Sequence, residues 1–322
     1  MDEIKQPQAS AQRPRPEHLV RNFRHPSKEA LDVVENSIRK NYHGNLVNEL
    51  NYDAEAYALF VKADLRAHLI GRLQVDRYKI IPWLDAARSL TGLRILEVGC
   101  GTGSSTVALA EQGADVVGVD IDERVLVVAR DRCNAYGVSA ELLQRNADSI
   151  LQTFGVGRFD MIIFFASLEH MTIEERLVAL RDAWAMLPQG GLLTIIETPN
   201  RLWFDDSHTS DLPFFNWLPD ELAFRYSRMS PAPRFRTLYE TYDENSKLSF
   251  LRDGRGMSYH EIDLAIGPAE DLQVVSCCRS FDPAKVFVSD VGRAYQAILK
   301  RIRPNLHEGF FEEYLDLIIR KP

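Results

Sequence analysis

The pattern of hydrophobic and polar positions changes near Arg94. Before that residue, the stretches 28–40 and 54–90 carry apolar residues at helical spacing. One face of the second stretch is marked by Leu65, Leu69, Leu73 and Ile80. This spacing predicts a helical cap over residues 28–90.

After Arg94, five short apolar runs follow, most of them separated by helix-like stretches. The run MIIFF at 161–165 is apolar at every position, which is typical of a strand buried on both faces. The five predicted strands are Arg94–Val98, Asp115–Asp120, Ala140–Gln144, Asp160–Phe165 and Leu192–Glu197. Such alternation predicts right-handed β-α-β units and a doubly wound, mostly parallel α/β sheet.

The last third of the chain departs from this alternation. Residues 198–257 are rich in Pro, Arg, Asp and aromatic residues, and excursions of this length usually serve as lids or substrate loops. A helix is expected to begin at Ser258, because Ser258 and Glu261 have the spacing of a capping box. Further elements are predicted at 272–278 (strand), 286–302 (helix) and 314–320 (last strand).

A glycine-rich turn follows the first predicted strand. Gly99, Gly101 and Gly103 allow positive φ and let a ligand lie against the backbone, and the next helix offers free N–H groups. The third glycine comes one residue earlier than in the dinucleotide fingerprint. Glu97 would repel a pyrophosphate, so the pattern favours a positively charged ligand without phosphate.

Asp120 ends the second predicted strand. An acid at this position can accept hydrogen bonds from both hydroxyls of a ribose. Asp120 could instead cap a helix, because Ile121-Asp122-Glu123 opens one.

These motifs resemble those of the class I S-adenosylmethionine-dependent methyltransferases, which have a Rossmann-like fold. ILEVGCGTG (95–103) looks like the first motif of that family and VVGVDID (116–122) like the second. The resemblance extends to the tripeptide Asn146-Ala-Asp148, to FDMIIFFASLEH (159–170), to LPQGGL (187–192) and to the closing LIIRKP (317–322). It covers about Leu93–Asn200 closely and leaves the helical cap and the insert outside.

The resemblance implies a seven-stranded sheet with an antiparallel last strand, S-adenosyl-L-methionine as cofactor and S-adenosyl-L-homocysteine as product. The glycine loop would lie under the methionine part, Asp120 would hold the ribose, and Asp148 would receive the adenine amino group. The cofactor-binding residues expected on this basis are Glu97, Gly99, Cys100, Gly101, Gly103, Asp120, Ile121, Ala147, Asp148, Phe164 and Phe165.

Candidate acceptor residues follow from the rule that ligands of open α/β sheets bind at the carboxyl ends of the strands. Those expected at this edge are Glu169, His170, Asp205, Asp206, His208, His260 and Glu261. Methyl transfer to oxygen needs a base, and the pKa of histidine is suited to that role. We predict His208 or His260 as the base, with Glu261 orienting it. His170 is assigned to the cofactor wall, as the resemblance implies, rather than to base catalysis. Alternatively, Glu261 only closes its capping box and His260 lies on an outer face.

Two further interpretations stay open for this edge. Glu169, Asp205, Asp206, His208 and His260 could together bind a divalent ion, but no pair has close ligand spacing, so we predict no metal. The aromatic stretch 214–217 could line an acceptor pocket or pack the insert onto the domain.

Composition bounds the partners. The net charge of −8 disfavours nucleic acid, although the basic stretch 225–236 keeps that alternative open. No apolar run approaches the roughly 20 residues of a membrane span. Residues 1–27 lack a secretory signal and are expected to form a disordered or loosely ordered tail. The cysteines Cys100, Cys133, Cys277 and Cys278 are interpreted as buried thiols in a reducing compartment, so a cytoplasmic location is predicted.

The sequence thus predicts three regions: the tail, the helical cap, and a methyltransferase domain over residues 91–322. The acceptor would be a small molecule, lipid-like or carrier- or glycan-linked, with oxygen preferred and nitrogen and carbon open. The alternatives are a NAD-dependent oxidoreductase and a non-catalytic methyltransferase-like subunit. The sequence leaves open whether the chain is a monomer or a homodimer.

Overall fold

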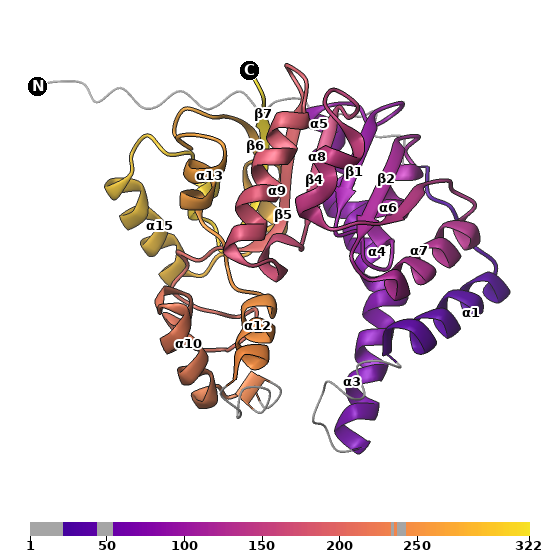
Figure 1. Ribbon diagram of the computed structural model, residues 1–322, viewed down its shortest axis with the longest axis horizontal. Helices are drawn as coiled ribbons and strands as arrows, with labels where there is room; N and C mark the ends of the chain where they lie inside the picture. The colour runs from indigo at the N-terminus through magenta and orange to yellow at the C-terminus, as the bar shows by residue number, and fades with distance from the viewer. Residues whose placement is uncertain (1–21, 44–53, 233–234, 237–242) are drawn as a thin grey trace, which may run out of the picture.

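A seven-stranded sheet forms the centre of the protein, in a computed structural model that describes residues 22–43, 54–232, 235–236 and 243–322 (Figure 1). The strand order is β3-β2-β1-β4-β5-β7-β6. The strands are β1 (Arg94–Val98), β2 (Asp115–Asp120), β3 (Glu141–Gln144), β4 (Met161–Phe165), β5 (Leu192–Pro199), β6 (Gln273–Cys277) and β7 (Tyr314–Arg320). Strands β1 to β5 pair in parallel, and β7 is antiparallel to both β5 and β6. The predicted fold is therefore confirmed.

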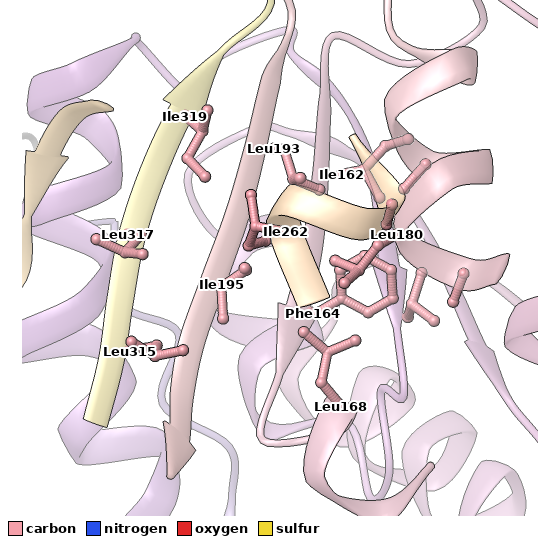
Figure 2. Close-up of a cluster of buried hydrophobic side chains, with 14 of the residues drawn as sticks. Ile162, Phe164, Leu168, Leu180, Leu193, Ile195, Ile262, Leu315, Leu317 and Ile319 are labelled. Carbon is pink, nitrogen blue, oxygen red and sulfur yellow. The ribbon is translucent and has the colours of Figure 1, made fainter. Parts of the chain in front are cut away.

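Both faces of the sheet are buried, as the uninterrupted apolar runs predict. Successive side chains of a strand point to opposite faces, so Leu96 and Ile162 join one core cluster while Ile95 and Met161 join the other. Figure 2 shows the first cluster, in which side chains of β5 and β7 meet Ile262. Each fully buried aliphatic side chain contributes about 1.5–3 kcal/mol, so these runs fix the strand register.

Helices cover the two faces of the sheet. The helices that follow the strands are α6 (Ser104–Ala110), α7 (Glu123–Tyr136), α8 (Ile150–Phe154), α9 (Ile173–Met186), α13 (Tyr259–Ala265), α14 (Cys278–Phe281) and α15 (Asp290–Ile302). Apolar residues of α9 and α13 belong to the first cluster, and those of α6 and α7 to the second. The capping box predicted for Ser258 and Glu261 is present. Helix α15 begins later than predicted because Ser289 caps it and accepts a hydrogen bond from the Gly292 N–H.

The predicted helical cap is built from α1 (Lys28–Ser37), η1 (Ile38–His43), α3 (Ala54–Arg66), η2 (Ala67–Gly71), α4 (Arg72–Val75), η3 (Asp76–Ile80) and α5 (Ile81–Ala87). Buried Arg132 of α7 ties it to the glycine loop. Its guanidinium donates to the carbonyl oxygens of His68 (2.6 Å), Leu69 (3.1 Å) and Thr102 (2.8 Å). One side chain thus fixes the cap relative to the first motif.

The expected tail needs one correction. Residues 22–27 lie against the domain, since the Arg24 N–H donates to Glu111 (2.8 Å) and the Phe23 ring packs on Tyr78. Residues 1–21 lie outside the described part of the chain.

The insert after β5 has its own small core. Its helices are η6 (Phe215–Trp217), α10 (Asp220–Tyr226), η7 (Ser227–Met229) and α12 (Glu244–Arg252). Phe215, Phe224 and Phe250 are buried against one another. Within the aromatic stretch 214–217, Phe215 therefore packs the insert, whereas Phe214 and Trp217 are exposed. Helices α10 and α12 on one side and α3 on the other extend beyond the same edge of the sheet (Figure 1).

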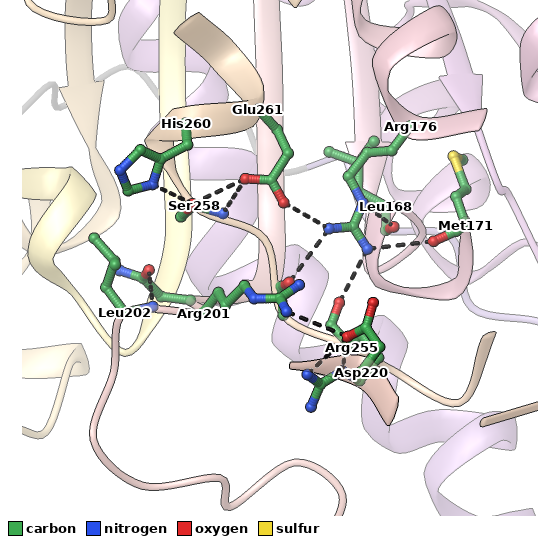
Figure 3. A network of polar contacts seen from close by, with 12 residues as sticks. Leu168, Met171, Arg176, Arg201, Leu202, Asp220, Arg255, Ser258, His260 and Glu261 are labelled. Carbon is green, nitrogen blue, oxygen red and sulfur yellow. Dashed lines mark hydrogen bonds and ion pairs between the residues drawn. The ribbon is translucent and has the colours of Figure 1, made fainter. Parts of the chain in front are cut away.

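A second buried arginine, Arg176 of α9, anchors the insert (Figure 3). It donates to the carbonyl oxygens of Leu168, Met171, Arg255 and Gly256 and pairs with Glu261 at 3.1 Å. Five acceptors around one guanidinium satisfy nearly all of its donors, which offsets the cost of burying the charge. The end of the insert is thereby fixed to the turn after β4.

Candidate active site

A cavity of about 1080 Å³ lies at the carboxyl edge of the sheet. Its lining comes from the glycine loop, the end of β2, the turns after β3, β4 and β5, the helical cap, the insert and the start of β7. Segments far apart in the sequence therefore share one chamber. This is the edge that the topology rule predicts.

The glycine loop presents bare backbone to the cavity. Gly99 and Gly101, with φ of +82° and +50°, both line it. A Cβ on Gly99 would lie 2.4 Å from Ser167 Cβ, whereas one on Gly101 would meet nothing within 4 Å. Gly99 is thus required by packing, and Gly101 leaves space in which a ligand can approach the chain. Gly103 instead packs on Ala129 and is not a lining residue.

Asp120 stands at the end of β2 and lines the cavity. Its Oδ2 accepts from the Gly101 N–H (2.9 Å) and its Oδ1 from the Asp122 N–H (2.9 Å). Burial raises the pKa of Asp120, and these N–H groups oppose the rise. The cap of α7 is Asp122, which accepts from the Arg124 N–H, so the helix-cap alternative for Asp120 is wrong. Each carboxylate oxygen keeps a free acceptor position for a hydroxyl.

Glu97 lies behind the glycine loop rather than in the cavity wall. It is fully buried and accepts from the hydroxyls of Ser105 and Thr106, the latter at 2.6 Å. Burial raises its pKa to about 7 against these hydrogen bonds. Glu97 therefore fixes the first turn of α6, while Ser105 itself lines the cavity.

The other expected cofactor residues divide by geometry. Cys100, Ile121, Ala147 and Phe165 line the cavity. Phe164 does not, because neighbouring residues of a strand point to opposite faces and its ring is buried in the core. Asp148 is exposed and outside the lining, where its neighbours Asn146 and Ala147 are found instead.

Two of the histidines expected at the carboxyl edge reach the cavity. His170 and His208 both line it, with ring centroids 6.5 Å apart. His170 Nδ1 lies 2.8 Å from the carbonyl oxygen of Arg252. His208 comes from the insert, as predicted.

His260 and Glu261 are corrections to the predicted catalytic set. His260 is exposed and not a lining residue; its ring stacks on Tyr259 and its Nδ1 lies 3.0 Å from Ser258 Oγ. Glu261 accepts from the Ser258 N–H and pairs with Arg176 (Figure 3). Both belong to the capped first turn of α13, which turns away from the cavity. Chain connectivity correctly predicted that α13 begins at the carboxyl edge of the sheet, but it did not predict which way the side chains of His260 and Glu261 point.

The two acids that follow β5 lie outside the cavity. Buried Asp206 accepts from the N–H and hydroxyl groups of both Thr209 and Ser210. Asp205 is exposed, and its backbone forms an isolated antiparallel β-bridge with Pro213. Neither lines the cavity.

Sequence reasoning missed the polar face of the helical cap. His68, Arg72, Asp76 and Lys79 all line the cavity. Burial and neighbouring arginines lower the pKa of His68 to about 3, so it is neutral, and burial raises the pKa of Asp76 well above its usual value. The spacing of these four residues (i, i+4, i+8 and i+11) indicates a polar face of a helix next to the apolar face already noted, and it could have predicted their shared position.

Sequence reasoning also missed two residues with strained backbone. Ala166 and Glu197, at the ends of β4 and β5, have φ of +43° and +53° and line the cavity. The Glu197 N–H donates to Asp316 at 2.7 Å, and burial raises the pKa of Asp316 to about 6. Left-handed backbone at non-glycine residues is costly and clusters at functional sites.

Residues 95–191 match a family model described as a methyltransferase domain. The chain is 31% identical over 140 residues to a ubiquinone biosynthesis O-methyltransferase of Pseudomonas aeruginosa, covering 42% of this chain and 56% of that protein. It is 33% identical over 119 residues to the protein of the same name from Methylococcus capsulatus, covering 37% and 48%. The chain thus spans about half the length of the curated relatives it matches.

Among solved structures, a SAM-dependent methyltransferase from Methanosarcina mazei is similar, with 26% identity and a TM-score of 0.35 over 38% of this chain and 59% of that one. Among the described residues, no helix combines the length and the apolar character needed to cross a membrane.

Proposed function

We propose that this chain, whose residues 95–191 match the family model of a methyltransferase domain, transfers a methyl group from S-adenosyl-L-methionine to an acceptor hydroxyl. One observation carries the proposal. The bare backbone of the glycine loop and the carboxylate of Asp120 share a single cavity with His170 and His208.

The donor end of the cavity fits the cofactor. Gly99 and Gly101 leave backbone exposed beside open space, and Asp120 offers acceptor positions for two ribose hydroxyls. Ile121 and Ala147 supply apolar surface next to Asp120, where an adenine ring would lie. When bound, S-adenosyl-L-methionine supplies a methyl group on a sulfonium, which is already an activated leaving group.

The chain's own contribution is to position the acceptor and to remove its proton. Alignment of acceptor and methyl carbon is the largest available effect, because effective molarities in well-oriented reactions are high. His208 lies on an exposed segment of the cavity wall and would take the hydroxyl proton at a ring nitrogen. His170 would remain fixed by its contact with the carbonyl of Arg252.

Oxygen is the preferred acceptor atom. The curated relatives are named as O-methyltransferases, which supports this choice. A cavity of about 1080 Å³ exceeds the upper range of ordinary small-molecule sites, so it has room for both cofactor and acceptor. The proposed acceptor classes are those predicted from the sequence: a small molecule, a lipid-like molecule, or a group linked to a carrier or glycan.

The proposal is tested in two steps. Calorimetry with S-adenosyl-L-methionine and with NAD should give binding of the first only. Binding of NAD alone would mean that the chain is an oxidoreductase. A panel of hydroxylated acceptors is then screened for S-adenosyl-L-homocysteine. Cofactor binding without product from any acceptor would favour the non-catalytic alternative.

A cytoplasmic location remains part of the proposal. All four cysteines are buried free thiols, which supports a reducing compartment. Analytical ultracentrifugation would decide between monomer and homodimer.

A further inference from the structure

We propose that Glu169, His170 and His208 form a binding site for one divalent transition-metal ion at the acceptor end of the cavity. One ligand atom of each residue lies within 4.8 Å of the other two. Glu169 and His170 belong to the turn η5 (Leu168–His170) after β4, and His208 belongs to the insert. Two imidazoles and a carboxylate are donors that suit Zn²⁺, Co²⁺ or Fe²⁺.

The state of Glu169 is the first argument. It is fully buried, and neither carboxylate oxygen has a hydrogen-bond partner within the described structure. Three other buried acids are satisfied: Glu97 by two hydroxyls, Glu111 by Arg77, and Asp206 by Thr209 and Ser210. An unpaired buried carboxylate is costly, and a cation would remove that cost. Burial raises the pKa of Glu169, with nearby His170 opposing the rise.

The orientation of His170 is the second argument. Its Nδ1 lies 2.8 Å from the Arg252 carbonyl oxygen, which can only accept, so Nδ1 carries the proton. In the neutral imidazole the lone pair is then on Nε2, which lies 3.9 Å from Glu169 Oε1. Metal-binding histidines are held in this way, with the second ring nitrogen donating to a carbonyl or carboxylate.

The seat of His208 is the third argument. The ring packs directly on Gly254, whose φ is +104°. A Cβ at Gly254 would lie 2.7 Å from His208 Cδ2 and 2.8 Å from Nε2. Bonds of about 2.0–2.2 Å would bring the three donors to roughly 3.4 Å apart, so binding requires a modest side-chain rotation. The exposed ring of His208 has room to make it.

The consequence for catalysis rests on the proposed function. Three protein ligands leave a coordination position open, and both histidines line the cavity, so an acceptor oxygen can occupy it. The ion would lower the pKa of the acceptor hydroxyl, whose proton then leaves to solvent. His208 would act as a ligand, and the acceptors would be hydroxyl compounds that bind metal.

Calorimetry of the metal-free full chain with ZnCl₂ alone tests the site. We expect one Zn²⁺ per chain. Loss of a ligand in Glu169→Gln or His208→Ala should weaken binding more than about 100-fold, beyond the 10–100-fold typical of outer partners. His260→Ala removes an exposed histidine outside the cavity and should leave binding unchanged. Absence of stoichiometric binding, or equal weakening in His260→Ala, would overturn the proposal.

Thermal unfolding guards against misfolded variants. Glu169→Gln keeps the shape and removes the unpaired charge, so its metal-free form should melt above the wild type. Zn²⁺ should raise the midpoint of the wild type and leave that of Glu169→Gln unchanged; a Zn²⁺ response in Glu169→Gln would contradict the site.

The two proposals fail in different ways. If Zn²⁺ binds but S-adenosyl-L-methionine does not, the proposed function is wrong and the metal site stands. If the cofactor binds and turnover persists in excess chelator, the metal inference is wrong and His208 remains the base.

Discussion

The two ends of the cavity differ in how their charges are satisfied. At the donor end (Gly99, Gly101 and Asp120), the carboxylate of Asp120 already accepts two backbone N–H groups. At the acceptor end (Glu169, His170, Glu197 and His208), Glu169 has no hydrogen-bond partner and Glu197 holds a strained backbone. The carboxylate at the donor end is therefore already held by the backbone before a ligand arrives, whereas the buried carboxylate of Glu169 at the acceptor end is not.

This difference indicates that ligand binding has different energetic consequences at the two ends. A preorganised donor end can hold its ligand without rearranging, because few groups must be ordered on binding. At the acceptor end, an incoming cation or hydroxyl would relieve a desolvated charge, so binding there is coupled to the state of Glu169. Changes at the two ends should therefore affect different measurements.

The largest expected effect is on turnover. Replacing His208 by Ala should slow methyl transfer by about 10²–10⁴-fold at saturating cofactor, because the acceptor hydroxyl loses its activating group, whether His208 acts as base or as metal ligand. His260→Ala should match the wild type, since that ring is outside the cavity. Rates of S-adenosyl-L-homocysteine formation measure both. A slow His260 variant with a normal His208 variant would reverse the assignment.

A second large effect concerns the anchor of the insert. Arg176→Met removes the partner of Glu261 and of four carbonyl oxygens and should cost about 3–5 kcal/mol in the free energy of unfolding. Denaturant titration measures the loss. The matched control is Arg181→Met, an exposed arginine of the same helix, with an expected change within about 0.5 kcal/mol. Similar losses in both would show that the buried network adds nothing.

A smaller effect is expected on cofactor affinity when the donor end is changed. Asp120→Ala should weaken S-adenosyl-L-methionine binding by about 1–3 kcal/mol, through loss of hydrogen bonds to a charged acceptor. Asp115→Ala changes the same residue type at the opposite end of β2 and should bind normally. Calorimetry compares them. Unchanged affinity in Asp120→Ala would show that the ribose lies elsewhere.

The smallest expected effect is a pH dependence of the free energy of unfolding that comes from Asp316, which is hydrogen-bonded to Glu197. Burial raises the pKa of Asp316 to about 6, above its value in the unfolded chain, so the folded state binds the proton more tightly. The contribution of Asp316 is therefore favourable below about pH 4 and is lost as pH rises to about 6. Asp316→Asn should remove this slope and be about 1–2 kcal/mol more stable at pH 7.

Unfolding measured at several pH values, with Asp115→Asn as the exposed control, tests this sign. A variant that keeps the wild-type slope between pH 4 and 6 would assign the titration to another group.

The sequence by itself determined the sheet and much of the donor end. Apolar runs such as 161–165 are typical of strands buried on both faces, and Gly99, Gly101 and Asp120 lie within 22 consecutive residues, 99–120. Local spacing suffices there, because a strand, a turn and a helix position these groups without help from distant segments. Even so, Phe164 and Asp148 were assigned to the cavity and face elsewhere.

Tertiary structure alone decided the acceptor end. His170, His208 and Glu197 come from three segments, and their meeting depends on Arg176 fixing the insert to the turn after β4. No local rule specifies which side of a capped first turn faces a cavity, so His260 and Glu261 were misplaced although their helix was predicted correctly. Connectivity brings elements to one edge; packing of buried charges decides which side chains meet there.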